Sequence, residues 1–490
     1  MGNLIPVSRE KLVPLLKAFP YQTEAIEAIW DFEYAAVFHE QGLGKTKIAI
    51  DVALHWLSTE AVDTVLIITK KLLINNWVRE CKVHCKLNPA ILSSSRNANF
   101  EVFNRPCRIV IANYEIAISE KNRLLLYLKT RDVGIILDES TKIKNPASRI
   151  YSAFICLRTY AKRRLILTGT PMSNRPYDIW AQIQFLDGGL SLGYDFFDFK
   201  KRLDIPKNNN HESIDEFETS LSTVWESISS FAIRETKDSG VIQLPSKTYT
   251  ALECDWEDRQ YEMYSEYKEE LKAIVVKNGI PKEDNAEVIL KRLIRLVQIC
   301  SNPKLIDDNY GGIPGKIDVL SSLITSIRSK NEKAIIWTSF IQNADSLTSL
   351  FRKYNAVKVH GSMNYNDRNK SIDRFLNDDT CSVFIATPAS AKEGLTLTVA
   401  NHAIYYDRNF SLDDYLQSQD RIHRISQQRP CYIYNLLMRD SIDQWIQIML
   451  EAKRTAARFG QNDITLEDFQ NNMRYDFPSM LNSVLGIDTL

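Results

Sequence analysis

The chain has 490 residues, of which 44% are hydrophobic and 25% are charged, a composition typical of a globular protein. Lysine plus arginine and aspartate plus glutamate both number 61, so the net charge is zero. This excludes a protein that attracts nucleic acid with its whole surface. The N-terminal residues lack a signal-peptide pattern, no apolar run is long enough to span a membrane, and the eight cysteines are scattered. We therefore expect a protein of the cytoplasm of a prokaryote or virus-infected cell, or of the nucleus, that is not secreted.

The first predicted element is a helix over residues 19–30, entered through Pro20. Gln22 lies in its first turn. Its amide is either an ordinary solvated group or a reader of adenine, because it offers both a donor and an acceptor.

A strand-like apolar run at residues 34–38 leads into the segment 40–46, Glu-Gln-Gly-Leu-Gly-Lys-Thr, and a helical pattern follows. A strand, a glycine turn and a helix start of this kind are typical of a phosphate-binding loop. Lys45 would reach the β- and γ-phosphates, and the Thr46 hydroxyl would coordinate Mg²⁺. His39 stands where the full pattern has glycine, so a glycine turn that caps an ordinary helix is the alternative.

Buried-strand patterns recur at residues 64–69 and 108–112. Lys70 follows the first of them, and Asn113 and Tyr114 follow the second. In open α/β sheets ligands bind beyond the carboxyl ends of the strands, so these polar residues are candidates for ligand contact.

The strand pattern at residues 133–137 ends in two acids, Asp138 and Glu139. Downstream of a phosphate loop, Asp138 would hold Mg²⁺ and Glu139 would orient and deprotonate the attacking water. A further strand, at residues 164–167, ends in Thr168-Gly169-Thr170-Pro171. These hydroxyls either sense the γ-phosphate or form a plain turn.

From about residue 185 to 313 the pattern becomes helical and charged, which predicts helical insertions and a hinge. A second α/β block begins at residue 333, with strand patterns at 333–340, 357–362, 382–387 and 402–407. Strands that alternate with helices predict a second parallel sheet. Arg421 and Arg424 have helical i,i+3 spacing. They are either arginine fingers that neutralise charge on the γ-phosphate or part of a surface ion-pair helix with Asp420.

In this order the motifs resemble the superfamily-two helicase core, and specifically its Swi/Snf-type ATP-dependent DNA translocase branch. The resemblance rests on the segments 40–46, 167–171 and 420–427, the last reading Asp-Arg-Ile-His-Arg-Ile-Ser-Gln. It covers residues 19 to 450 and includes the replacement of glycine by His39. It implies an α/β fold with two RecA-like parallel-sheet lobes and helical insertions between them, with ATP bound between the lobes.

The resemblance also implies a domain division and roles for individual residues. The expected domains are an ATP-binding lobe at 1–188, helical insertions and a hinge at 189–312, a second lobe at 313–450, and a helical tail at 451–490. The implied catalytic residues are Lys45, Asp138, Glu139, Arg421 and Arg424. The implied nucleotide-binding residues are Gln22, Gly42, Leu43, Gly44, Lys45, Thr46 and Gly394, with Thr46 and Asp138 at Mg²⁺. Segments that resemble the DNA-tracking ones contain Lys70, Asn113, Tyr114, Ser339, Thr396 and Phe410.

Two departures from the branch pattern stand out. Ser140-Thr141 replaces glycine or alanine followed by histidine, and Phe410-Ser411-Leu412 replaces an aromatic followed by Asn-Pro. The implied function is an ATP-dependent translocase on double-stranded DNA that acts as a monomer or within a complex, away from membranes. One alternative is a superfamily-two helicase that acts on single-stranded DNA, forks or RNA. A second alternative is a non-catalytic module that binds DNA or protein.

Overall fold

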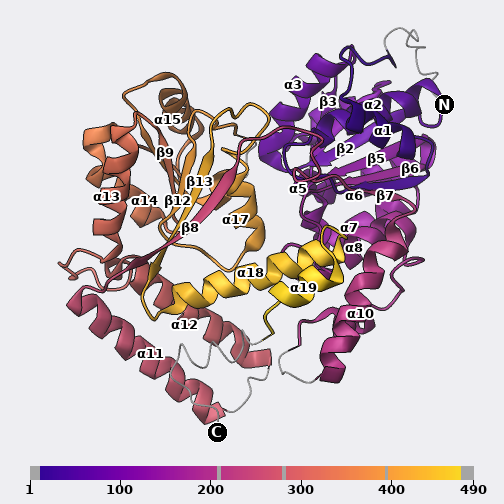
Figure 1. Cartoon of the computed structure of the whole chain (residues 1–490). Coiled ribbons are helices and arrows are strands. Elements are labelled where there is room, and N and C mark those ends of the chain that lie inside the picture. Colours follow the sequence, from indigo (N-terminus) through magenta and orange to yellow (C-terminus); the bar gives the residue numbers. More distant parts are fainter. Residues whose placement is uncertain (1–11, 207–210, 279–282, 392–394, 476–490) are drawn as a thin grey trace. The chain divides into compact units, whose positions relative to one another are not determined.

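The computed structural model describes residues 12–206, 211–278, 283–391 and 395–475. The chain folds into two compact units, each built on its own parallel sheet (Figure 1). Within the described residues, unit 1 is drawn from the ranges 1–205, 211–242 and 456–471, and unit 2 from 206–210, 243–455 and 472–490. The chain therefore returns to unit 1 after completing the sheet of unit 2.

Seven parallel strands form the sheet of unit 1, in the order β3-β4-β2-β5-β6-β1-β7. All six residues of β2 are buried, as expected for a parallel strand covered on both faces. Because the strands are parallel, their carboxyl ends lie along one edge of the sheet. The bounds are β1 Tyr34–Val37, β2 Thr64–Thr69, β3 Ala90–Ile91, β4 Ile109–Asn113, β5 Val133–Asp138, β6 Arg163–Leu167 and β7 Ala232–Ile233.

The helices of unit 1 come from the first half of the chain and from its C-terminal part. They are α1 Pro20–Ile29, α2 Lys45–Ser58, α3 Ile74–His84, α4 Arg96–Asn104, α5 Tyr114–Ser119, α6 Lys121–Thr130, α7 Arg149–Arg158, α8 Trp180–Asp187, α9 Phe196–Leu203, α10 His211–Ile228 and α19 Leu466–Asn472. Helix α18, Ile442–Gly460, starts in unit 2 and ends in unit 1.

Six parallel strands form the sheet of unit 2, in the order β10-β11-β9-β12-β13-β8. Their bounds are β8 Lys247–Cys254, β9 Ala334–Trp337, β10 Val357–Val359, β11 Val383–Ala386, β12 His402–Tyr405 and β13 Cys431–Met438. The remaining helices are α11 Asp258–Asn278, α12 Glu283–Ser301, α13 Lys316–Ser329, α14 Ile341–Leu350, α15 Tyr365–Asn377, α16 Pro388–Ala391 and α17 Leu412–Gln419. The two predicted parallel sheets are confirmed.

The predicted boundaries at residues 188, 312 and 450 differ from this division. The region expected to be a helical insertion supplies α10 and β7 to unit 1 and β8 to the edge of the second sheet. Residues 456–471, expected in a separate tail, belong to unit 1. One cause is long-range pairing. Strand β8 pairs with β13 along all eight of its residues, although the two strands lie far apart in the sequence.

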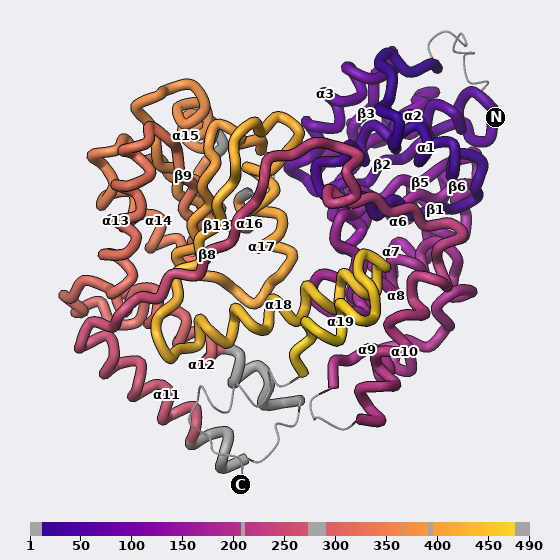
Figure 2. Tube along the Cα trace, viewed as in Figure 1, coloured from indigo at the N-terminus to yellow at the C-terminus, as the bar shows by residue number. Residues whose placement is uncertain are grey.

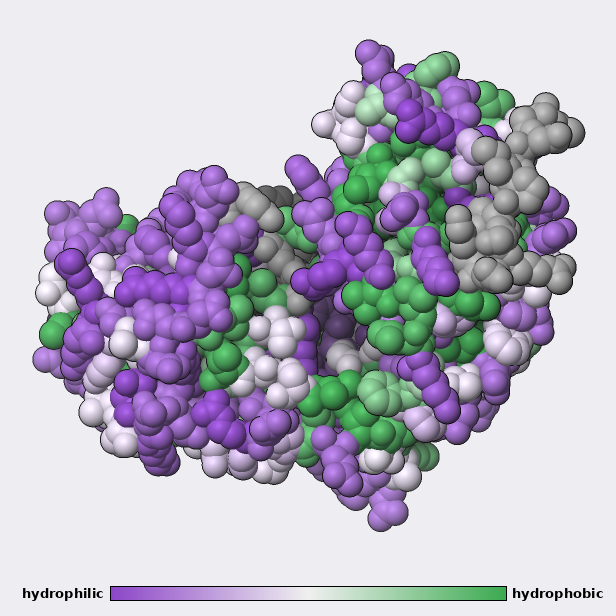
Figure 3. Space-filling view, turned by 90° about the horizontal axis from the view of Figure 1, so that it is seen from above, coloured by the Kyte–Doolittle hydropathy of each residue, from purple (hydrophilic) through white to green (hydrophobic). Residues whose placement is uncertain are grey.

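Hydrophilic side chains cover most of the face drawn in Figure 3, with smaller apolar patches between them. This mixture is ordinary for a folded protein, because polar groups alone cannot cover its surface. A search of the described residues finds no helix with both the length and the apolar character needed to cross a membrane.

Candidate active site

The loop between β1 and α2 has the backbone that its sequence predicts. Gly42 and Gly44 have φ angles of 90° and 74°, in the left-handed region that glycine enters at little cost. A Cβ at Gly44 would also lie 2.2 Å from Nε2 of Gln22. The backbone conformation thus favours glycine at Gly44, and a Cβ there would displace the Gln22 amide from the loop. The turn brings the N-terminus of α2, the positive end of its dipole, to the loop.

Lys45 closes this loop on itself. Its Nζ donates to the backbone carbonyl oxygens of His39, at 2.8 Å, and Glu40, at 3.2 Å. The His39 side chain is only 2% exposed. Burial, together with the positive charges of Lys45 and Arg234, lowers the pKa of His39 to about 3. The His39 imidazole is therefore neutral near pH 7 and does not repel the ammonium group of Lys45.

Asp138 is fixed by donors from three other elements. One carboxylate oxygen, Oδ2, accepts from the Thr69 hydroxyl at 2.8 Å and from Nε1 of Trp77 at 2.7 Å. The Tyr114 hydroxyl donates to its backbone carbonyl oxygen at 2.8 Å. Burial, and then the charge of Glu139, raises the pKa of Asp138. A cation at this carboxylate would offset that cost.

Glu139 lies just beyond β5 in a left-handed conformation, with φ of 54°. Its carboxylate accepts from Nε2 of Gln41, a residue of the phosphate loop, at 3.1 Å, and pairs with Nζ of Lys70 at 3.4 Å. Burial acts to raise the pKa of Glu139, but the positive charges of Lys70 and Lys45 outweigh it and the pKa is lowered. The two adjacent acids are thus shifted in opposite directions, and Glu139 stays ionised.

The predicted magnesium ligands suit that ion. Mg²⁺ prefers oxygen donors and keeps several waters when it binds with phosphates, and Asp138 and Thr46 supply a carboxylate and a hydroxyl. In the described part of the chain, no three His, Cys, Asp or Glu side chains form a cluster that could hold a metal. A magnesium ion bound with phosphates does not require such a cluster.

Gln22 is held by the protein itself. Its Oε1 accepts from the backbone N–H of Phe19 at 3.0 Å, and its Nε2 donates to the Leu43 carbonyl oxygen and the Tyr21 hydroxyl, both at 3.3 Å. The residue is 4% exposed. Gln22 therefore links α1 to the phosphate loop, and adenine recognition by its amide remains a prediction.

The turn after β6 touches the phosphate loop. A Cβ at Gly169 would lie 3.0 Å from the backbone nitrogen of Gln41 and 3.3 Å from the carbonyl oxygen of His39. The same turn is tied to the acidic strand, because the Ser140 hydroxyl bonds to Oε1 of Gln182, at 2.7 Å, and Nε2 of Gln182 donates to the Pro171 carbonyl oxygen, at 2.9 Å. Ser140 thus connects these two segments where the family pattern has other residues.

Arg421 and Arg424 lie in unit 2, on the turn that follows α17 and not on a helix as their spacing predicts. Nη1 of Arg421 donates to the Leu395 carbonyl oxygen at 3.5 Å, and Nη1 of Arg424 donates to the Thr396 hydroxyl at 2.9 Å. Nε of Arg424 also donates to the backbone carbonyl oxygen of Asp420 at 2.8 Å. Gly394 lies outside the described residues.

The structure gives structural tasks to the predicted DNA contacts of unit 1. Tyr114 is fully buried, and its ring packs against Phe154 at a centroid distance of 5.3 Å. Asn113 is 6% exposed and caps α5 by accepting from the backbone N–H of Ile116. The Tyr114 side chain is thus enclosed by protein in this structure, and DNA contact by its segment remains a prediction. Lys70 pairs with Glu139, as described above.

The predicted DNA contacts of unit 2 are placed differently. Thr396 is exposed. Ser339 is held by its backbone N–H, which donates to Oδ1 of the buried Asp407 at 2.6 Å. The ring of Phe410 packs edge-on against Trp445, at a centroid distance of 6.0 Å. DNA contact by these three residues remains a prediction.

Sequence reasoning missed the residues that orient the acids and the loop. They are Thr69, Trp77, Gln41, Gln182 and Arg234. Gln41 lies within the predicted phosphate loop, but its residue type indicates no role; the fold brings the other four to the site from distant parts of the chain. The position of Thr69 at a strand end was a further clue, since strand ends of a parallel sheet converge.

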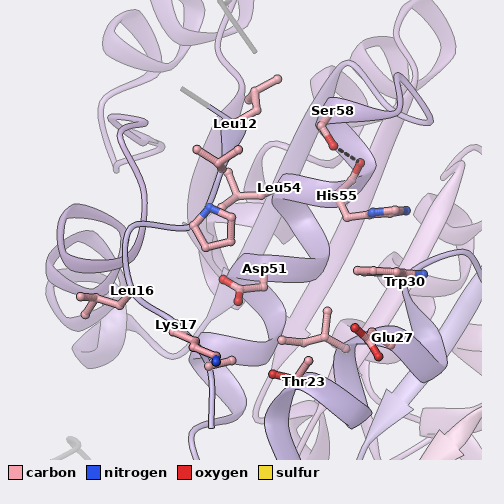
Figure 4. Close-up of a pocket in the computed structure, with 14 residues that line it drawn as sticks. Leu12, Leu16, Lys17, Thr23, Glu27, Trp30, Asp51, Leu54, His55 and Ser58 are labelled. Atoms are coloured by element: carbon pink, nitrogen blue, oxygen red, sulfur yellow. Dashed lines mark hydrogen bonds between the residues drawn. The ribbon is translucent and has the colours of Figure 1, made fainter. Parts of the chain in front are cut away.

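A separate cavity of about 480 Å³ lies in unit 1, between the segment 12–18 and helices α1 and α2 (Figure 4). It is bounded by Leu12, Lys17, Asp51 and Leu54, and at one side by the stacked rings of Trp30 and His55, whose centroids are 4.3 Å apart. No residue with a predicted catalytic or nucleotide-binding role lines it. It is therefore distinct from the candidate active site.

Comparison with known families decides the relationship. The model of the SNF2-related domain matches residues 21–305, more than half of the chain, and the model of the helicase conserved C-terminal domain matches residues 315–426. The chain belongs to the SNF2-related family. The predicted family is thereby confirmed, together with its superfamily-two helicase core.

Three relatives illustrate the range of this SNF2-related family. The ISWI chromatin-remodeling complex ATPase ISW1 of Saccharomyces cerevisiae is 27% identical and covers 88% of this chain and 40% of its own length. The putative ATP-dependent helicase/translocase YwqA of Bacillus subtilis is 27% identical, over 86% of this chain and 46% of its own length. The ATP-dependent DNA helicase DDM1 of Arabidopsis thaliana is 24% identical, over 89% of this chain and 61% of its own length. This chain thus spans less than two thirds of the length of these relatives.

A solved structure, the SWI2/SNF2 ATPase core of Sulfolobus solfataricus in complex with dsDNA, is 23% identical to this chain. The alignment covers 96% of this chain and 99% of that one, with a TM-score of 0.43.

Proposed function

We propose that this SNF2-related chain hydrolyses ATP with Mg²⁺ and uses the energy to move along double-stranded DNA. The observation that carries the proposal is the placement of Glu139. Its carboxylate is bonded to Gln41 of the phosphate loop and is kept ionised by Lys70 and Lys45. An ionised carboxylate beside a phosphate loop is the group required to orient and deprotonate an attacking water.

The residues then divide the work. The loop amides and Lys45 would bind the phosphates, and Lys45 would exchange its two carbonyl acceptors for phosphate oxygens. Thr46 and Asp138 would hold Mg²⁺, which when bound neutralises charge on the phosphate oxygens. Arg421 and Arg424 would stabilise the charge that develops on the γ-phosphate. The DNA contacts would be made mainly to phosphates, through segments that include Ser339, Thr396 and Phe410, so binding should weaken with salt and tolerate any sequence.

The test is ATP hydrolysis by the wild-type chain and by Lys45→Ala and Glu139→Gln, with and without duplex DNA. We expect duplex DNA to stimulate the wild type, and both substitutions to lower kcat by at least about 100-fold, while DNA affinity stays within about twofold. Unchanged hydrolysis in both variants would mean that the site lies elsewhere. No hydrolysis by the wild type under any condition would favour the non-catalytic module.

The second candidate is a helicase acting on single-stranded DNA, forks or RNA. The names of two relatives, a helicase/translocase and a DNA helicase, favour keeping it. Stimulation of hydrolysis by duplex DNA, single-stranded DNA, forks and RNA separates the two. Strongest stimulation by RNA or by single strands would replace the duplex translocase. We expect the protein to act in the cytoplasm or the nucleus, as a monomer or within a complex.

A further inference from the structure

Residues 456–471, here called the C-terminal segment, pack tightly onto unit 1. Figure 2 shows this segment, in yellow, beside α10. A Cβ at Gly460 would lie 2.6 Å from the Leu221 side chain and 2.9 Å from that of Met172. Nε2 of Gln470 donates to the Glu218 carboxylate at 2.7 Å. The C-terminal segment is therefore packed into unit 1, the unit that carries the phosphate loop.

One ion pair connects the C-terminal segment to the strand next to the loop. Nε and Nη2 of Arg234, just after β7, donate to the two carboxylate oxygens of Asp463, each at 2.6 Å. Both side chains are buried, with exposures of 9% and 8%. A buried two-pronged pair of this kind fixes the plane of the guanidinium group.

The remaining guanidinium nitrogen reaches the entry of the phosphate loop. Nη1 of Arg234 donates to the carbonyl oxygen of Phe38 at 2.6 Å. The next two carbonyl oxygens along the chain, those of His39 and Glu40, are the acceptors of Lys45. The backbone N–H of Glu40 also donates to the Glu235 carbonyl oxygen at 2.8 Å. Arg234 and Glu235 thus hydrogen-bond to the backbone at the start of the phosphate loop.

We propose that Asp463 is a positioning residue for ATP hydrolysis, and that the C-terminal segment sets the geometry of the phosphate loop through Arg234. Asp463 holds the guanidinium, the guanidinium holds the Phe38 carbonyl, and this carbonyl fixes the backbone whose oxygens Lys45 leaves when phosphate binds. Turnover in unit 1 therefore depends on residues that follow the sheet of unit 2 in the sequence. The inference rests on the ATPase activity proposed above.

The experiment compares Asp463→Asn with Glu218→Gln in the full chain. Asp463→Asn removes the charge that orients Arg234 and keeps the size of the side chain. Glu218→Gln is the matched control, because it removes the charge of a carboxylate on α10 that accepts a hydrogen bond from Gln470 of the same segment. With saturating duplex DNA, we expect Asp463→Asn to lower kcat for ATP about tenfold, with a smaller change in KM, because a charge-assisted contact is lost behind the loop. Glu218→Gln should retain kcat within about twofold.

Three further results separate the possible failures. Equal kcat values for Asp463→Asn and Glu218→Gln would overturn the inference while leaving the proposed function intact. A wild type without ATPase activity would overturn the proposed function, and the inference with it. If Asp463→Asn folds poorly, amide hydrogen exchange of residues 39–46 in Asp463→Glu decides. Exchange there should be faster than in Glu218→Gln without nucleotide, and equal exchange would overturn the inference.

Discussion

Asp138 and Glu139 are adjacent in sequence and yet have opposite shifts in pKa. Burial and the charge of its neighbour raise the pKa of Asp138, whereas Lys70 and Lys45 overcome burial and lower that of Glu139. Such a separation gives two carboxylates two tasks. One suits a cation and the other a proton acceptor. Lys70, predicted to contact DNA, therefore also lowers the pKa of the proposed base.

Replacing Lys70 should change how hydrolysis depends on pH. Lys70→Met removes the nearest positive charge from Glu139, so the pKa of that carboxyl rises. Because Glu139 acts only when ionised, the acid limb of the kcat–pH profile should move to higher pH. The measurement is kcat for ATP at saturating duplex DNA over roughly pH 5 to 9.

Lys71→Met is the control, because Lys71 is the next residue in the chain and is exposed. It should leave the acid limb in place. If Lys70→Met weakened DNA binding and left the profile unmoved, the role predicted from the sequence would hold and the pairing with Glu139 would have no catalytic part.

Some of these residue roles were open to prediction and others were not. Lys45, Asp138 and Glu139 stand in local motifs whose chemistry follows from order and spacing. Trp77 donates to Asp138 across 61 positions of sequence, and no local pattern announces such a contact. The burial of Tyr114, predicted from its segment to contact DNA, was not open to prediction, because a hydroxyl at a strand exit is equally suited to bond a backbone carbonyl oxygen within the protein.

At the scale of elements, the turn between β1 and α2 depends on one glycine. Gly44→Ala forces a side chain into a left-handed residue and places its Cβ 2.2 Å from Gln22. We expect it to reduce the free energy of unfolding by at least about 1–2 kcal/mol and to weaken ATP binding. Urea denaturation and nucleotide titration measure the two effects.

Gly361→Ala is the matched control, because a Cβ there meets no atom within 4 Å and the backbone is not left-handed. It should change the free energy of unfolding by less than about 0.5 kcal/mol. Equal effects of the two substitutions would contradict the account of the loop.

The central strands were predictable because they are short apolar runs, buried on both faces. β8 was not, since its residues alternate in exposure along the edge of the sheet and lie in a charged, helical region. β13, its partner, follows the arginine motif and was assigned no strand. Pairing with a distant segment places β8 in the sheet, whereas β13 carries strand-favouring residues such as Tyr432, Ile433 and Tyr434 and was open to prediction.

For the whole molecule, the arginines of unit 2 give a test of cooperation. Arg421→Ala or Arg424→Ala should lower kcat by about 1,000-fold, because arginine fingers stabilise charge in the transition state, while ATP affinity changes little. The measurement is single-turnover hydrolysis together with nucleotide binding. Arg439→Ala is the control, because Arg439 is an exposed arginine of the same unit, paired with Glu253 and Asp255. Wild-type kcat in either variant would mean that the replaced arginine takes no part in ATP hydrolysis.

The return of the chain to unit 1 has a consequence for how the protein is made. A ribosome that has released residue 242 has produced the whole sheet of unit 1 but not Asp463 or α19. The ion pair of Arg234 with Asp463 then cannot form until more than 200 further residues have been synthesised. Since domains tend to fold as they emerge, the nascent unit would wait, with an incomplete core, until translation reaches its final segment.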